Sequence, residues 1–233
     1  MAIDRWKNAS VGTGTEIWAG IEFFTILPAV NSHETVSALA AQYCEMGADK
    51  IYLYNFYREC IQDAGGMEKY GFTDISLFKD YSQYESDDTR TRKIWNAASD
   101  YETAARSVRR HILSPSDIVP DGYRSDYPLP LYYNGEANVS KLTGEIKGKK
   151  ILLYLGVDPQ DCAPEVLMDG ITAALIGLTD DAYFSKCEIC GGDRGDLGDV
   201  VYYAYSAEAS SGFTRRITLR GKGRLSYLEI KVT

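Results

Sequence analysis

The most informative part of the chain is residues 15–57, which read TEIWAGIEFFTILPAVNSHETVSALAAQYCEMGADKIYLYNFY. Residues 15–27 are an almost continuous apolar run around Glu22, and residues 50–57 are a second such run. Continuous apolar runs are typical of strands that are covered on both faces, as in parallel sheets. A helix is predicted between the two runs, so this stretch predicts one βαβ unit with a right-handed crossover.

The boundaries of the first helix are marked by capping residues. Asn31 is the predicted N-cap, and Glu34 follows three residues later, as in a capping box. Apolar residues then recur at helical spacing from Val36 to Tyr43. Gly47 suits the left-handed position that ends many helices.

A second, longer helix is predicted over residues 94–112. Its apolar positions step by four and three residues in turn: Ile94, Ala98, Tyr101, Ala105, Val108 and Ile112. The cationic residues 109–111 would lie at the negative end of the helix dipole, and Ser114-Pro115 would end the helix.

The pattern changes after a proline-containing stretch, residues 116–130, which we interpret as a linker. Short strands are expected beyond it, at residues 138–146, 150–156, 165–168, 171–178, 199–207, 213–220 and 224–232. In the last of them, apolar residues alternate with Glu229 and Lys231, which predicts one buried and one solvent-facing side. The fold class is therefore α/β plus all-β, with an antiparallel sandwich or jelly roll at residues 131–233.

Composition excludes several classes of function. The 233 residues carry a net charge of −8, which disfavours a nucleic-acid partner. No apolar run approaches the roughly 18 residues of a membrane helix, and residues 1–10 do not resemble a secretory signal. The chain has 18 tyrosines, whose flat apolar faces suit sugar stacking as well as sheet surfaces.

The remaining motifs predict no metal and no cofactor. Cys187 and Cys190 have the spacing of half a zinc site, but no second pair follows them, so a thiol pair or a disulfide is the preferred interpretation. Residues 191–199, GGDRGDLGD, contain three aspartates that could bind calcium, although a solvated turn explains them as well.

Residues 15–57 resemble glycoside-hydrolase-like barrel proteins. The shared pattern is a G-[IV]-E strand, a helix of the form s-x-E-x-v-x-x-A-x-x-y-x-x-G-A-D, and an I-Y-L-[YF]-N-[FW] strand. The resemblance implies that residues 1–115 are the last strands of a (β/α)₈ barrel and that residues 131–233 are an accessory sandwich. It also implies a C-terminal portion of such a protein, with a carbohydrate partner and a secreted or cell-surface location.

The resemblance implies roles for individual residues. Glu22 matches the nucleophilic carboxylate at the end of strand seven, and Asn55 and Tyr57 match the rim of the sugar site on strand eight. Tyr54 and Arg58 join them as substrate-binding candidates, because residues at the carboxyl ends of barrel strands line the active site. Glycoside hydrolysis needs two carboxyl groups, so the second would come from an N-terminal barrel segment or from a second copy of the chain.

Three alternatives stay open at this point. Glu22 could be a structural, salt-bridged carboxylate. The sandwich could bind glycan without chemistry, through tyrosines such as Tyr202 and Tyr203, which could equally be core residues. The sandwich could also serve only in assembly, because an incomplete barrel has unpaired strand edges and favours homo-oligomers. Tyr52, Tyr54 and Phe56 are expected to be core and helix contacts, because alternate residues of a barrel strand point inward and outward.

Overall fold

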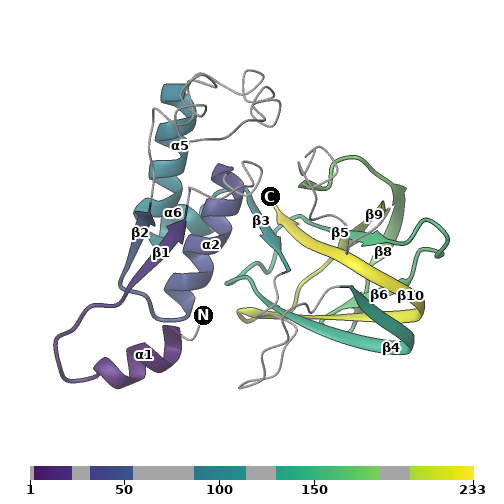
Figure 1. Cartoon of the computed structure of the whole chain (residues 1–233), viewed down its shortest axis with the longest axis horizontal. Helices are drawn as coiled ribbons and strands as arrows, with labels where there is room; N and C mark the ends of the chain where they lie inside the picture. Colours follow the sequence, from purple (N-terminus) through teal and green to yellow (C-terminus); the bar gives the residue numbers. More distant parts are fainter. Residues whose placement is uncertain (1–2, 23–31, 55–86, 114–129, 184–199) are drawn as a thin grey trace, which may run out of the picture. The chain divides into compact units, whose positions relative to one another are not determined.

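The computed structural model describes residues 3–22, 32–54, 87–113, 130–183 and 200–233. The described residues form two compact units, one within residues 3–107 and the other within residues 108–233. Most of the regular structure is antiparallel β, accompanied by a few helices (Figure 1).

The predicted βαβ unit is present in the first compact unit. Strand β1 (Trp18–Glu22) and strand β2 (Lys50–Tyr54) are parallel neighbours, and helix α2 (His33–Glu45) connects them. The N-cap of α2 is Ser32 and not Asn31 as predicted, because the Ser32 side chain accepts the Thr35 N–H at 3.2 Å. Gly47 follows the helix with φ +99°, which confirms its predicted left-handed conformation.

Two further helices and the N-terminal helix complete this unit. Helix α1 spans Ile3–Ser10, helix α5 spans Asp87–Ser99 and helix α6 spans Tyr101–Arg106. Ile94 and Ala97 of α5 pack with Val36 of α2 and Ile21 of β1 in one apolar cluster. Helices α2 and α5 therefore cover one face of the two-stranded sheet.

The single helix predicted over residues 94–112 is wrong. Asp100 ends the first helix and caps the next one, because its carboxylate accepts the Thr103 N–H at 2.8 Å. Beyond Ser107 the chain is extended, and strand β3 (Arg109–Ile112) pairs antiparallel with residues 229–232 of the second unit. Strand pairing over this segment outweighs its helical apolar spacing.

In the second unit, the described residues form an eight-stranded antiparallel sheet that is nearly closed on itself. Besides β3, its strands are β4 (Leu131–Leu142), β5 (Ile151–Val157), β6 (Glu165–Met168), β7 (Ile171–Thr172), β8 (Ala174–Leu178), β9 (Val201–Ala207) and β10 (Thr214–Val232). The order along the sheet is β7-β6-β10-β5-β9-β8, and β3 and β4 also pair with β10. This arrangement confirms antiparallel β structure in residues 131–233, and it agrees with a sandwich.

Strand β10 organises this unit. Two strands were predicted, at residues 213–220 and 224–232, but residues 214–232 form one continuous strand that bends near its middle (Figure 1). The first half pairs with β4 and β6, and the second half pairs with β3 and β5. Gly221 and its register partner Gly135 both have positive φ, at +129° and +105°, so the bend lies where no side chain opposes it.

The main core of the second unit lies between the two halves of this sheet. Strands β5, β6 and β10 contribute many of its fully buried aliphatic side chains: Ile151, Leu153, Leu155, Met168, Ile217 and Leu219. The linker predicted at residues 116–130 falls outside the described residues except for Pro130.

Candidate functional site

The structure brings two of the predicted site residues together. Glu22 and Tyr54 are the last residues of parallel strands β1 and β2, and they are register partners. Both therefore lie at the carboxyl edge of the strand pair, where the barrel resemblance places a sugar site. Asn55, Phe56, Tyr57 and Arg58 lie outside the described residues.

Sequence reasoning missed an open aromatic surface on the same strand pair. Trp18 is 56% exposed and Tyr52 is 51% exposed, so the prediction that Tyr52 is a core contact is wrong. Gly20, the register partner of Tyr52, is also exposed, and no neighbouring atom lies closer than 4.0 Å to the position of an added Cβ. We call Trp18, Gly20 and Tyr52 the aromatic face.

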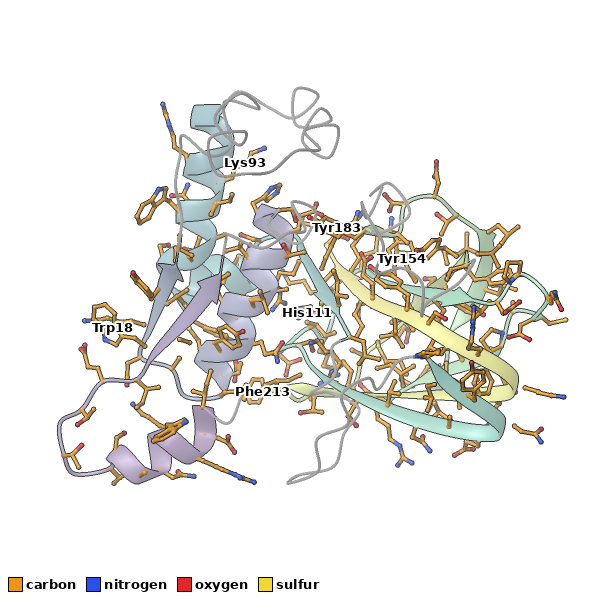
Figure 2. The ribbon with its side chains drawn as sticks, in the orientation of Figure 1. Trp18, Lys93, His111, Tyr154, Tyr183 and Phe213 are labelled. Atoms are coloured by element: carbon orange, nitrogen blue, oxygen red, sulfur yellow. The ribbon has the colours of Figure 1, made fainter. Side chains whose placement is uncertain are left out.

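The aromatic face is open because the helices pack on the other side of the strands. Ala19 and Ile21 alternate with Trp18 and Gly20 along β1, and both are buried. In Figure 2, Trp18 projects from β1 away from α2. The sequence of residues 18–21, WAGI, contains a signal for this arrangement. Trp18 and Gly20 alternate with Ala19 and Ile21, so the two pairs lie on opposite faces of the strand.

Local charges at the aromatic face are paired. The Glu16 carboxylate accepts hydrogen bonds from Lys50 Nζ and from Trp18 Nε1, each at 2.9 Å. The hydrogen bond from Lys50, followed by that from Trp18, holds the pKa of Glu16 below its usual value. Lys50 Nζ lies 4.9 Å from the Trp18 ring centroid, a cation–π distance that steadies the indole.

A buried polar cluster in the second unit was also missed. Glu229 is 0% exposed, so the prediction that it belongs to the solvent-facing side of its strand is wrong. Its carboxylate accepts hydrogen bonds from Arg110 Nη1 at 2.6 Å, the Tyr227 hydroxyl at 2.5 Å and the Tyr183 N–H at 2.8 Å. Desolvation raises the pKa of Glu229, and the Arg110 charge and these donors oppose that rise.

Asp181 forms the half-exposed rim of this cluster. Its carboxylate accepts hydrogen bonds from the Tyr154 hydroxyl at 2.5 Å and from Lys231 Nζ at 2.9 Å, and it lies 3.5 Å from Arg110 Nη2. Desolvation would raise the pKa of Asp181, but the hydrogen bonds from Tyr154 and Lys231 outweigh it and lower the pKa to about 2.

The polar groups of this cluster bind one another, which indicates a structural role. The Arg110 guanidinium lies 5.9 Å from the Tyr154 ring centroid and 5.8 Å from that of Tyr183, and both tyrosines are labelled in Figure 2. Each oxygen of the Glu229 carboxylate already accepts at least one hydrogen bond from the protein. We therefore assign the cluster to holding β3, β10 and residues 181–183 together.

The sandwich tyrosines do not form one stacking surface. Tyr202 packs edge-to-face against Tyr227, with ring centroids 5.5 Å apart and an interplanar angle of 82°. Tyr203, the next residue of β9, packs against the main core on the opposite face of the strand. Both are half-buried, whereas Tyr132 on β4 is largely exposed.

Within the described residues, no group of three or more His, Cys, Asp or Glu side chains is arranged to hold a metal ion. Cys44 and Cys162 are free thiols, and the Cys187–Cys190 pair and the aspartates of residues 191–199 lie outside the part of the chain that the structure describes. No helix among the described residues is long and apolar enough to cross a membrane.

No family model and no curated protein matches the chain.

Proposed function

We propose that this chain is the C-terminal portion of a glycoside-hydrolase-like protein and that it binds carbohydrate through the aromatic face. The observation that carries the proposal is the exposure of Trp18 and Tyr52 on the open side of a parallel strand pair that ends at Glu22. Two features support the interpretation that these strands are part of the last βαβ unit of a barrel. The strands are parallel, and the helices pack on one side of them.

The aromatic face has the chemistry of a sugar platform. Trp18 and Tyr52 offer flat apolar surfaces to the C–H side of a pyranose ring, and the Tyr52 hydroxyl adds a polar group. Gly20 has no side chain on this face of the sheet, so a sugar ring meets no obstruction there. Because Lys50 is already paired with Glu16, the face suits neutral sugars better than charged ones.

Glu22 is the candidate active-site carboxylate of this proposal. It lies at the carboxyl edge of β1, four residues along the strand from Trp18. A sugar bound on the aromatic face would extend toward it. Hydrolysis requires a second carboxyl group on the other side of the glycosidic bond, and an N-terminal barrel segment or a second copy would supply it.

Affinity electrophoresis of the full chain tests the binding proposal. The gels contain laminarin, xylan, galactomannan, xyloglucan or pullulan, and the wild type is compared with Trp18→Ala and Tyr52→Ala. At least one polysaccharide should retard the wild type, and both variants should lose most of that retardation. Trp6→Ala on α1 and Tyr132→Ala on β4 remove comparably exposed aromatics elsewhere and should leave retardation unchanged. If Tyr132→Ala lost as much retardation as Trp18→Ala and Tyr52→Ala, the carbohydrate-binding site would instead be assigned to the sandwich.

The role of Glu22 is tested separately, in the complete assembly that hydrolyses the retained polysaccharide. Glu22→Gln should lower the rate at least a hundredfold while retardation in the gel stays within twofold, because the amide preserves shape but removes the nucleophile. Glu102→Gln on α6 removes an exposed carboxylate outside the aromatic face, so it is the matched control and should leave the rate unchanged. An unchanged rate in Glu22→Gln would remove Glu22 from the catalytic proposal and leave a binding module.

A structural or assembly role is the second candidate. The observation that favours it is the sheet edge at β8, which is apolar and carries no charge. Failure of every polysaccharide to retard the wild type would favour this role over carbohydrate binding.

A further inference from the structure

Strand β3 carries His111, which is labelled in Figure 2, on the side that faces the main core of the second unit. His111 is the register partner of Ile230 on β10, and Leu228 and Val232 flank Ile230 on the same face. Leu113 follows His111 by two residues and also belongs to the main core. The imidazole is therefore a polar group on the apolar side of its strand.

The imidazole of His111 is buried and makes no hydrogen bond to the part of the chain that the structure describes. The residue is 1% exposed, and neither Nδ1 nor Nε2 has a partner. A buried polar group without a partner costs free energy, so an apolar side chain would be more stable at this position. An imidazolium would cost more, because it would also bring a charge into the core.

The charges near His111 are positive. Among the described residues, Arg109 and Lys141 are the charged groups that act on the imidazole, and both are buried. Arg109 lies on the same face of β3 as His111, and Lys141 lies on the core-facing side of β4. Arg215 is the register partner of Lys141, but its charge is paired with Asp169 at 2.6 Å. A proton on His111 would thus add a third positive charge to this part of the core.

Burial and these charges make the closed strand and the released strand differ in proton affinity. Desolvation, followed by the charges of Arg109 and Lys141, holds the pKa of His111 well below its usual value of 6.5. In a released strand the imidazole is solvated and regains its ordinary pKa. Below pH 6.5 the released strand therefore binds a proton that the closed strand excludes. The contribution of His111 to stability is complete above that pH and is lost as the pH falls below it.

Strand β3 is also the part of the sheet that can separate from it most simply. It has four residues and, over the described residues, pairs with β10 alone. A short edge strand opens at a lower free energy than a central strand. On the opposite face of β3, the Arg110–Glu229 ion pair holds the strand at neutral pH. Because β3 begins two residues after α6, its release would lengthen the connection between the two units.

We propose that His111 makes the pairing of β3 with β10 sensitive to acid, so that protonation of its imidazole in mildly acidic solution releases β3. The proton comes from solvent and is lost again on neutralisation, so the release is reversible. Nothing in this inference involves sugar, and it stands or falls independently of the carbohydrate proposal.

Hydrogen exchange of the full chain, followed by mass spectrometry and corrected for the intrinsic exchange rate, tests the release. The opening constant of the β3 amides should be about thirtyfold larger at pH 5.0 than at pH 7.5, as expected for uptake of one proton by a group with a pKa of about 6.5. At both pH values the β3 amides should open more often than those of β5. A pH-independent β3 opening constant, or equal opening of β3 and β5, would overturn the proposal.

Two variants assign the response to His111. His111→Phe keeps a buried ring but takes up no proton, so its opening constant should change by less than about threefold over the same pH range. His33→Gln removes the other histidine of the chain and should keep the response of the wild type. A response in His111→Phe as large as that of the wild type would contradict the assignment.

Nuclear magnetic resonance of the His33→Gln chain covers the case in which His111→Phe fails to fold. His111 is then the only histidine, so isotope-labelled histidine gives a single imidazole signal. In the folded chain this signal should keep the chemical shift of a neutral imidazole down to about pH 5.5. A signal that titrates near pH 6.5 while the chain stays folded would overturn the proposal, because the closed strand would then accept the proton.

Discussion

Glu229 and Arg110 are separated by 119 residues in the chain, yet they form a buried ion pair between β10 and β3. Burial of two charges is costly, and the pair is tolerated because further donors satisfy the carboxylate. Removal of one partner leaves the other charge buried without its counterion. The pair therefore fixes the register of β3 on β10.

We predict that Arg110→Met lowers the free energy of unfolding by about 3–5 kcal/mol, the usual cost of breaking a buried pair. The double variant Arg110→Met/Glu229→Leu should recover a large part of this loss, since no unpaired charge remains. Urea unfolding of the two single variants and the double variant at pH 7 measures the coupling. Strictly additive losses would show that the two residues act independently.

Asp181 makes part of the stability depend on pH. Its pKa is about 2 in the folded chain against 3.8 as the ordinary value, so the native state favours the ionised form. This contribution is fully present well above pH 3.8 and is lost as the pH falls through the folded pKa of about 2. Because the side chain is 40% exposed, we expect about 1 kcal/mol after allowance for solvent screening.

Tyr154→Phe tests this pH dependence, because it removes the hydroxyl that donates to Asp181 and keeps the buried ring. The difference in unfolding free energy between the wild type and Tyr154→Phe should be largest near pH 6 and should shrink toward pH 2. Tyr205→Phe is the control, since the Tyr205 hydroxyl donates to the Pro164 carbonyl, which does not titrate. A Tyr154→Phe difference as constant with pH as that of Tyr205→Phe would rule out the Asp181 contribution.

At the scale of elements, the bend of β10 allows one strand to serve both halves of the sheet. Gly221 and Gly135 are register partners with positive φ, which other residues adopt at a cost. We predict that Gly221→Ala and Gly135→Ala each destabilise the chain by about 1–2 kcal/mol through backbone strain alone, because neither added Cβ meets an atom within 4 Å. Lys222 directly follows Gly221 in β10 and serves as the control. Lys222→Ala should change the free energy of unfolding by less than about 0.5 kcal/mol. Thermal unfolding compares the three variants, and a neutral effect at both glycines would contradict the account of the bend.

The elements that could be predicted from sequence are those whose signals are local. The βαβ unit follows from two apolar runs and a helix between them, and Gly47 marks the helix end. The predictions fail where pairing between residues far apart in the chain determines the secondary structure. Val108 and Ile112 fit a helical stripe, but residues 109–112 pair with the last residues of β10. Gly221 reads as the end of a strand, whereas it bends a continuous one.

At the candidate site, the sequence indicated position but not exposure. Glu22 and Tyr54 were expected at strand ends, and their register agrees with that expectation. Tyr52 and Glu229 were assigned to the wrong environments, one to the core and the other to solvent. Period-two alternation tells which residues share a face, and only tertiary packing tells which face is covered. The helices leave the Tyr52 face open, and residues 181–183 cover Glu229.

For the whole molecule, we propose that the βαβ unit binds carbohydrate through the aromatic face. The buried polar cluster around Glu229 belongs to the other compact unit, so the proposed binding site and this stabilising cluster can be changed separately.

The most direct test of carbohydrate binding at the aromatic face is the fluorescence of Trp18 itself. The chain has three tryptophans, so the Trp6→Phe/Trp95→Phe variant leaves Trp18 as the only indole. Titration with an oligosaccharide of the polysaccharide that retards the wild type should give a saturable blue shift of its emission, because a stacked sugar excludes water from the exposed ring. Emission that does not change, in a variant that the same polysaccharide still retards, would contradict carbohydrate binding at the aromatic face.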